Sequence, residues 1–256
     1  MRKFSCLAFF ALALAAAQNV AAQPQTAPQS DAAKADSFYR DGKFDEAAPI
    51  YAQLAKADPD NPWFHYNLGN SYYKTNKLGL AIASYMRAYR LLPRNGDIRY
   101  NLALALKRSG QTLVPQGMPE TVHRLYYLFS DVELQGLFWL ALWLACLAGA
   151  AFALIKQAKP VSLRVAAISA AFTLLFGGWW FLRAENDYSS PAVAIDSVTE
   201  IRSGPGPTFN TSATMPEGHI VEIIDSKEDW YEISIRAEGI KGWVLKTSVA
   251  PISEPS

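Results

Sequence analysis

Two long apolar runs, residues 134–155 and 165–182, contain no charged side chain. About 20 apolar helical residues are needed to cross the hydrocarbon core of a bilayer. The first run is long enough and the second is marginal but sufficient. We therefore predict a transmembrane hairpin of two helices, 134–155 and 165–182, which divides the chain into two soluble modules.

The loop between the two runs, residues 156–164, carries Lys156, Lys159 and Arg164. Short loops rich in Lys and Arg stay on the cytoplasmic side during insertion. We expect a cytoplasmic loop, with both soluble modules on the other side of the membrane.

The N-terminus agrees with this orientation. Arg2 and Lys3 precede an apolar stretch at 7–17, and small residues before Gln23 offer a cleavage site. This is the pattern of a secretory signal peptide, predicted here as residues 1–22. The alternative is an uncleaved anchor helix, for which the apolar stretch is short.

Composition and cysteine use exclude several functions. The formal net charge of +1 suggests no nucleic-acid partner. The two cysteines, Cys6 and Cys146, fall in the predicted signal peptide and in the first span, so they cannot build a disulfide framework or a metal site. The three histidines are scattered, and we recognise no carboxylate pair or nucleophile motif. We expect no enzyme activity, no cofactor and no metal.

Residues 23–30 are rich in Pro, Gln and Ala, and they are predicted to be a flexible lead-in. From 31 to 110 the sequence repeats with a period of 34 residues, pairing Phe38 with Tyr72 and Pro59 with Pro93. This segment resembles the tetratricopeptide repeat, with two units and the first helix of a third. The resemblance is strongest in the second unit, at Leu68, Gly69, Tyr72, Ala81, Tyr85, Ala88 and Pro93.

The first unit departs from the pattern. Lys34 and Ala35 replace the usual leucine and glycine, which predicts a poorly packed first helix. Because each unit buries its apolar face against its neighbours, so short an array needs a further partner surface. We expect dimerisation or membrane contact to supply it.

The resemblance implies peptide binding on the concave surface that the first helix of each unit lines. Arg40, Lys74 and Arg108 recur at one place in successive units and predict a basic ladder beside an amide ladder of Asn67 and Asn101. Amides pair with peptide backbone, and cations attract carboxylates. The alternative is plain solvation near helix ends. The candidate peptide-binding residues are Arg40, Asn67, Asn70, Lys74, Asn101 and Arg108.

Residues 120–133 carry apolar side chains at helical spacing and are predicted to form an interfacial helix, with its aromatic side at headgroup depth. His123 is interpreted as an interface group. Within the hairpin, small residues recur every four positions, at Ala141, Ala145, Gly149 and Ala153, and at Ser169, Thr173 and Gly177. Such rows predict close packing of the two spans, or of neighbouring subunits in a homo-oligomer.

Residues 192–252 change to short β-type runs broken by turns, with strands expected at 193–195, 198–202, 219–225, 230–235 and 239–245. This segment predicts a small all-β barrel. The order of Arg202-Ser203-Gly204-Pro205, Trp230-Tyr231 and Gly242-Trp243 resembles bacterial SH3 domains, which bind cell-wall peptides or protein segments. The candidate groove is Ser203, Pro205, Trp230, Tyr231 and Trp243. Alternatively, Trp230 and Trp243 fill the barrel core.

The predicted fold class is therefore multidomain: an α-helical tetratricopeptide repeat array, a transmembrane helical hairpin and a small all-β SH3-like barrel. This order of parts resembles the BatE-type proteins of bacterial aerotolerance operons. The resemblance implies an inner-membrane scaffold with periplasmic modules, partners that carry von Willebrand factor type A domains, and a role in oxygen or stress tolerance. The alternative is a peptidoglycan-binding or wall-sensing protein that acts through its SH3 domain.

Overall fold

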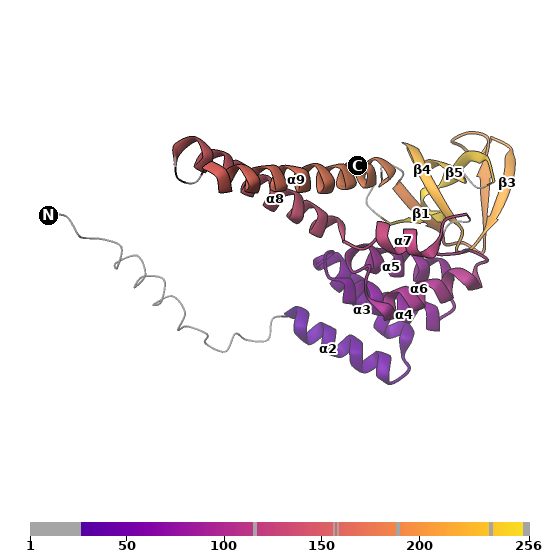
Figure 1. Ribbon diagram of the computed structural model, residues 1–256. Coiled ribbons are helices and arrows are strands. Elements are labelled where there is room, and N and C mark those ends of the chain that lie inside the picture. Colours follow the sequence, from indigo (N-terminus) through magenta and orange to yellow (C-terminus); the bar gives the residue numbers. More distant parts are fainter. Residues whose placement is uncertain are drawn as a thin grey trace.

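The computed structural model describes residues 27–114, 117–155, 157, 159–187, 190–235 and 238–252. It contains a helical repeat array, two long apolar helices and an antiparallel sheet domain (Figure 1). This is the fold class that the sequence predicts. The predicted signal peptide, residues 1–22, lies outside the described residues.

The repeat array consists of helix pairs whose starts follow the repeat period. Asn61 and Asn95 cap the first helices of the second and third units, and each accepts a backbone N–H with its side-chain oxygen. A cap of this kind satisfies N–H groups that have no partner inside the helix. The helices of the array are α2 (Ala27–Arg40), α3 (Phe44–Ala57), α4 (Pro62–Lys74), α5 (Leu78–Leu91) and α6 (Gly96–Arg108).

The first unit is better packed than its sequence predicts. α2 begins at Ala27, so residues 27–30 are helical instead of belonging to the lead-in. Ala35 is fully buried and packs in one cluster with Ala47 and Tyr51. Its small side chain allows α2 to approach α3 closely, so the missing glycine does not loosen the edge of the array.

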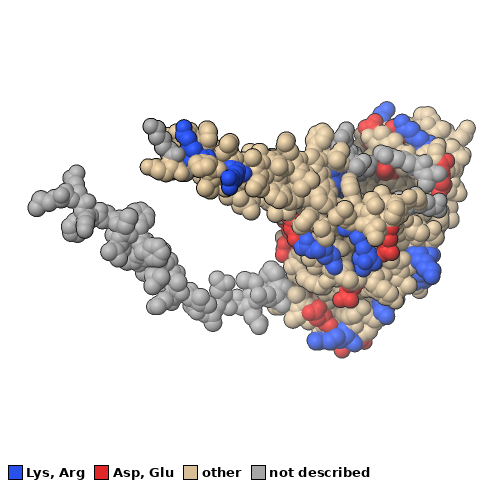
Figure 2. Space-filling view, viewed as in Figure 1, with Lys and Arg blue, Asp and Glu red and all other residues tan. Residues whose placement is uncertain are grey.

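Two long helices, α8 (Asp131–Leu154) and α9 (Lys159–Asp187), pack side by side and project from the rest of the molecule (Figure 1). Both are long and apolar enough to cross a membrane. They extend beyond the predicted spans, and most of the predicted loop 156–164 belongs to α9. On the face shown in Figure 2 the hairpin surface is largely uncharged, with Lys and Arg at its far tip.

The contact between α8 and α9 follows a seven-residue spacing. The buried side chains of the two helices lie at multiples of seven residues: Leu134, Ala141 and Ala148 on α8, and Ser162, Ser169 and Arg183 on α9. Such spacing keeps one seam of each helix on its neighbour. The predicted four-residue rows share only part of this seam, because Gly149 and Ala153 are exposed.

The predicted interfacial helix 120–133 is interrupted. α7 (Glu120–Tyr126) ends before Ser130, which starts α8 with a capping box to Glu133. His123 is buried, with its ring 4.8 Å from that of Tyr127, so it is not an interface group. The exposed residues of α7 include Val122 and Leu125 together with the ion pair of Arg124 and Glu120, so its exposed side is mixed and not aromatic, whereas Tyr127 packs inward.

Within residues 190–235 and 238–252 the sheet domain has seven antiparallel strands, in the order β3-β2-β6-β5-β4-β1-β7. Its core is formed by residues such as Ile201, Ile233 and Val244. The sequence does not predict β3 and β7, which are short or polar. The strands are β1 (Ser190–Ala194), β2 (Val198–Arg202), β3 (Thr211–Pro216), β4 (Ile220–Lys227), β5 (Trp230–Ile235), β6 (Ile240–Leu245) and β7 (Val249–Pro251).

The sheet domain packs directly on the repeat array through β1, β7 and α5. A Cβ atom at Gly79 would lie 2.2 Å from the carbonyl oxygen of Ala194, so the contact requires glycine there. The Gly79 N–H also donates to Glu217 Oε1 at 2.8 Å. Val193 and Ile252 belong to the same buried cluster as side chains of α5 and α6.

The sheet domain supplies an apolar surface that the short repeat array needs to complete its core. Among the described residues the array has no second helix in its third unit, and the sequence predicts that dimerisation or membrane contact completes its core. Instead, part of the chain's own sheet domain, together with Leu113 and Tyr127, packs against the apolar cluster of α5 and α6.

Ion pairs join the base of the hairpin to the repeat array. Arg183 Nη2 lies 2.7 Å from Asp131 Oδ1, and Arg90 Nη2 lies 3.8 Å from Asp131 Oδ2. Arg94 Nη1 donates to Glu133 Oε2 at 3.0 Å. Arg90 lies on α5, and Arg94 lies in the turn between α5 and α6. These ion pairs therefore fix the hairpin against the repeat array.

Candidate binding surfaces

The predicted asparagine ladder forms with a different partner. Asn101 Nδ2 donates to Asn70 Oδ1 at 3.1 Å and to Tyr66 Oη at 2.9 Å. Tyr85 Oη donates to the same Asn70 oxygen at 2.8 Å. Asn70 and Asn101 are therefore occupied in holding α4, α5 and α6 together. Burial, the largest cause, raises the pKa of Tyr85 and keeps it a neutral donor.

Asn67 is the amide that stays available. It is half-buried on α4, and within the described residues its side chain makes no hydrogen bond. A half-exposed amide offers both donors and an acceptor to an extended peptide backbone.

The predicted basic ladder divides in the same way. Arg108 Nη2 donates to Asn76 Oδ1 at 2.9 Å, and its guanidinium lies 5.5 Å from the ring centre of Tyr73. Arg40 and Lys74 are exposed, and in the described part of the chain their side chains make no hydrogen bond or ion pair. Two of the three cations are thus open to an anionic partner.

Exposed apolar side chains on α4 and α6 are absent from the sequence-based set. Tyr100 is 68% exposed, Trp63 46% and Leu104 41%. Tyr100 and Leu104 lie on the side of α6 opposite its buried residues Ile98 and Leu102. Their position off the buried face is a sequence signal that could have identified them, because large apolar groups there have no folding role.

The five predicted groove residues of the sheet domain do not share one face. Neighbouring residues of a strand point to opposite sides. Tyr231 therefore faces the core cluster, whereas Trp230 faces the other side, where the Arg202 guanidinium lies 5.8 Å from its ring centre.

Trp243 pairs with Arg202 of β2 and with Glu232 of β5. It is half-buried and lies outside the core cluster, so the structure does not support the alternative that it fills the core. Ser203 is exposed and Pro205 is half-buried in the turn that follows β2. Trp230 lies on this outer face but is only 8% exposed, so it is a buried residue, as the alternative expects, although it is not part of the core cluster. The accessible outer-face group is thus Arg202 and Trp243, with Ser203 and Pro205 in the adjoining turn.

Together these features define a class: a helical repeat protein with an SH3-like sheet domain and two long apolar helices. Residues 32–96 and 66–111 match the family model of the tetratricopeptide repeat, and residues 197–250 match that of the bacterial SH3 domain. No curated protein sequence is significantly similar to the chain.

Solved structures similar to the chain include a type III secretion chaperone of Yersinia enterocolitica, SycD. Its complex with a peptide of the translocator YopD is 21% identical, covers 57% of this chain and 92% of that chain, and has a TM-score of 0.32. The translocator chaperone SycD itself is 19% identical, covers 59% of this chain and 87% of that chain, and has a TM-score of 0.33.

Proposed function

We propose that this protein is a membrane-anchored scaffold of the bacterial envelope whose repeat array binds an extended segment of a protein partner. The observation that carries the proposal is the contrast between two sides of the array. The sheet domain packs against α5, whereas α2, α4 and α6 carry exposed polar and apolar side chains. Repeat arrays of this kind bind partners along their extended inner surface.

The chemistry of the exposed side chains indicates the kind of segment that fits. Asn67 pairs with peptide backbone, and Arg40 and Lys74 attract carboxylates. Tyr100 and Leu104 offer apolar contacts. We infer a partner segment that combines acidic and apolar residues.

In the proposed arrangement the hairpin spans the inner membrane, its basic tip lies in the cytoplasm, and both soluble modules lie in the periplasm. The charge of the tip supports this orientation. The resemblance to BatE-type proteins supports partners with von Willebrand factor type A domains and a role in oxygen or stress tolerance. The repeat and SH3 matches favour binding over catalysis. Homo-oligomerisation remains an alternative use of the hairpin.

The test is a crosslinking pull-down from membranes with an Arg40→Ala, Asn67→Ala, Lys74→Ala variant. These residues make no side-chain hydrogen bond in the described structure, so their loss does not disturb the internal network of Asn70 and Asn101. Lys227→Ala, at an exposed position of the sheet domain, is the control.

We expect the triple variant to lose a reproducible protein partner that the wild-type protein and Lys227→Ala both retain. Membrane fractionation and circular dichroism verify insertion and helix content. An unchanged partner list in a folded, inserted triple variant would contradict the proposal.

A second candidate is binding of peptidoglycan through the sheet domain. The face that carries Arg202 and Trp243 favours it, because the contact with the array uses β1 and β7 and does not involve these residues. Full-length protein in detergent should then pellet with isolated peptidoglycan, and Trp243→Ala should pellet less. Protein that stays in solution would remove this candidate.

A further inference from the structure

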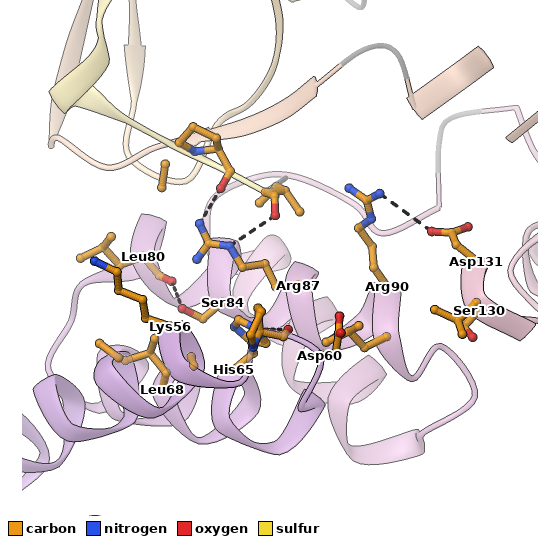
Figure 3. Close-up of a pocket in the computed structure, with 18 of the residues that line it drawn as sticks. Lys56, Asp60, His65, Leu68, Leu80, Ser84, Arg87, Arg90, Ser130 and Asp131 are labelled. Atoms are coloured by element: carbon orange, nitrogen blue, oxygen red, sulfur yellow. Dashed lines mark hydrogen bonds and ion pairs between the residues drawn. The ribbon is translucent and has the colours of Figure 1, made fainter. Parts of the chain in front are cut away.

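A cavity of about 1140 Å³ lies between α3, α5 and the first turn of α8, with β7 on its far side (Figure 3). Most of its lining comes from α3 and α5, and α4 contributes His65, Leu68 and Tyr72. The side chains proposed above to bind a partner do not line it. Its apolar lining includes Leu68 and Leu80, and its charged lining includes Lys56 and Arg87.

One wall of the cavity is formed by the part of the hairpin that would enter a bilayer. Asp131, Val132 and Glu133 line it, and they form the first turn of α8. Val132 is 70% exposed, and the apolar run of the span begins at the next position after Glu133. If the hairpin spans the membrane, as proposed above, the cavity therefore lies at headgroup level.

Arg87 is a cation without a carboxylate partner in the described structure. Its guanidinium donates to the carbonyl oxygens of Pro251 and Ile252, which satisfy hydrogen bonds but do not neutralise the charge. Burial, the largest cause, lowers the pKa of Arg87, which is the cost of holding this charge away from water. A bound anion would offset that cost.

The acidic residues around the cavity do not compensate Arg87. Asp131 is held by Arg183 and Arg90, and Glu133 by Arg94. Asp60 is exposed to solvent. Lys56, also exposed, has no hydrogen bond or ion pair among the described residues.

We propose that this cavity binds the phosphate headgroup of an anionic membrane phospholipid. Arg87 and Lys56 contact the phosphate, and the apolar wall at Leu68 and Leu80 contacts the carbon chains. A guanidinium and an ammonium are the side-chain groups that phosphate oxygens prefer, and charge-assisted bonds to them are the strong ones. Lipid in this place would hold the repeat array against the bilayer surface.

The test uses full-length protein in detergent, titrated with phosphatidylglycerol, phosphatidylcholine or inorganic phosphate, with native mass spectrometry and thermal unfolding as readouts. We expect phosphatidylglycerol to bind and to raise the unfolding temperature, and the other two to have little effect. Lys56→Ala and Arg87→Gln should each weaken phosphatidylglycerol binding by about tenfold. Lys227→Ala, at the exposed end of β4, is the matched control and should bind normally.

Lys56→Ala is the decisive variant, because an exposed lysine without a partner can be removed without unfolding the chain. Unchanged phosphatidylglycerol binding in this variant would overturn the proposal. Equal binding of phosphatidylcholine would overturn the role of anionic charge, and an equal shift with inorganic phosphate would indicate a site for the free ion.

The experiment also separates this proposal from the proposed function. Extraction of the protein from membranes by alkaline carbonate would overturn both the anchor and the lipid site. Firm anchoring without headgroup preference would overturn the lipid site alone. The partner pull-down tests substitutions of Arg40, Asn67 and Lys74, and these residues do not line the cavity.

Discussion

Two buried histidines, His65 and His123, have little contact with solvent. His65 is 7% exposed, and its Nε2 lies 2.8 Å from the carbonyl oxygen of Pro59. Its Nδ1 is buried and has no hydrogen-bond partner among the described residues. Burial, the largest cause, lowers the pKa of His65 below its ordinary value of 6.5. The pKa of His123 is also lowered, again mainly by burial.

The lowered pKa values make stability depend on pH. The folded state holds both histidines neutral, while the unfolded chain takes up protons below about pH 6.5. Stability is therefore complete above that pH and falls as the pH drops toward the folded-state values. Each histidine contributes a slope of at most about 1.4 kcal/mol per pH unit.

The measurement is thermal unfolding between about pH 7.5 and pH 5 for the wild-type protein and His65→Gln. Glutamine can donate a hydrogen bond but does not titrate in this range, so we expect the variant to lose less stability on acidification. Equal pH dependence in the two proteins would show that His65 does not contribute.

Tyr85 supports a second prediction at this scale. Tyr85→Phe removes the hydrogen bond to Asn70 and leaves that oxygen with one donor fewer. We expect a destabilisation of about 1 kcal/mol, measured by urea unfolding. Tyr100→Phe removes the same hydroxyl from an exposed ring and should change stability by less than about 0.5 kcal/mol.

At the scale of elements, the sequence predicts structure best where a regular period coincides with burial. The 34-residue period locates the helix pairs, and the caps at Asn61 and Asn95 repeat with it. Strands β3 and β7 have no such signal. β3 has one buried residue, Met215, and β7 has three residues in all. Their pairing depends on neighbours that the local sequence does not reveal.

Site residues show the same limit. The period predicts that Asn67 and Asn101 occupy equivalent places, which is a statement about each helix alone. It does not reveal that Asn101 pairs with Asn70, because that contact depends on how α4 and α6 pack. The break between α7 and α8 does have a local signal, because Ser130 and Glu133 form the capping-box pattern that starts a helix. The apolar spacing of residues 120–133 continues across the break and by itself predicts a single helix.

The seam between α8 and α9 gives a prediction for elements. Ala141→Leu inserts bulk between two packed helices and should lower the stability of the detergent-solubilised protein by about 1–3 kcal/mol. Ala150→Leu makes the same change at an exposed position of α8 and should have little effect. Unfolding in increasing sodium dodecyl sulfate compares them, and equal midpoints would contradict the assigned seam.

For the whole molecule, the decisive feature is that the soluble modules form one body. Gly79 and Glu217 are hydrogen-bonded although they are far apart in the sequence, and Val193 and Ile252 fill the core of the array. Neither module's local sequence predicts this contact. It explains how so short an array buries its apolar residues without a second chain.

We expect the two modules to unfold together. Calorimetry of the wild-type protein should show one transition for the soluble body, and Gly79→Ala should lower its midpoint by an amount equivalent to about 1–3 kcal/mol. Gly96→Ala adds a methyl group where no atom lies within 4 Å and should be neutral or slightly stabilising. Separate transitions in the wild-type protein would show that the contact does not couple the modules.

The pairing of Arg183 with Asp131 places the beginning of α8 beside the end of α9, so the chain leaves the soluble body and returns to it at nearly the same point. The hairpin is therefore an insertion between two parts of one soluble unit, and it can be deleted without separating the points at which the chain leaves and re-enters that unit. Replacing residues 131–187 with a short glycine-rich bridge should give a reagent that needs no detergent and keeps both the array and the sheet domain in their native arrangement.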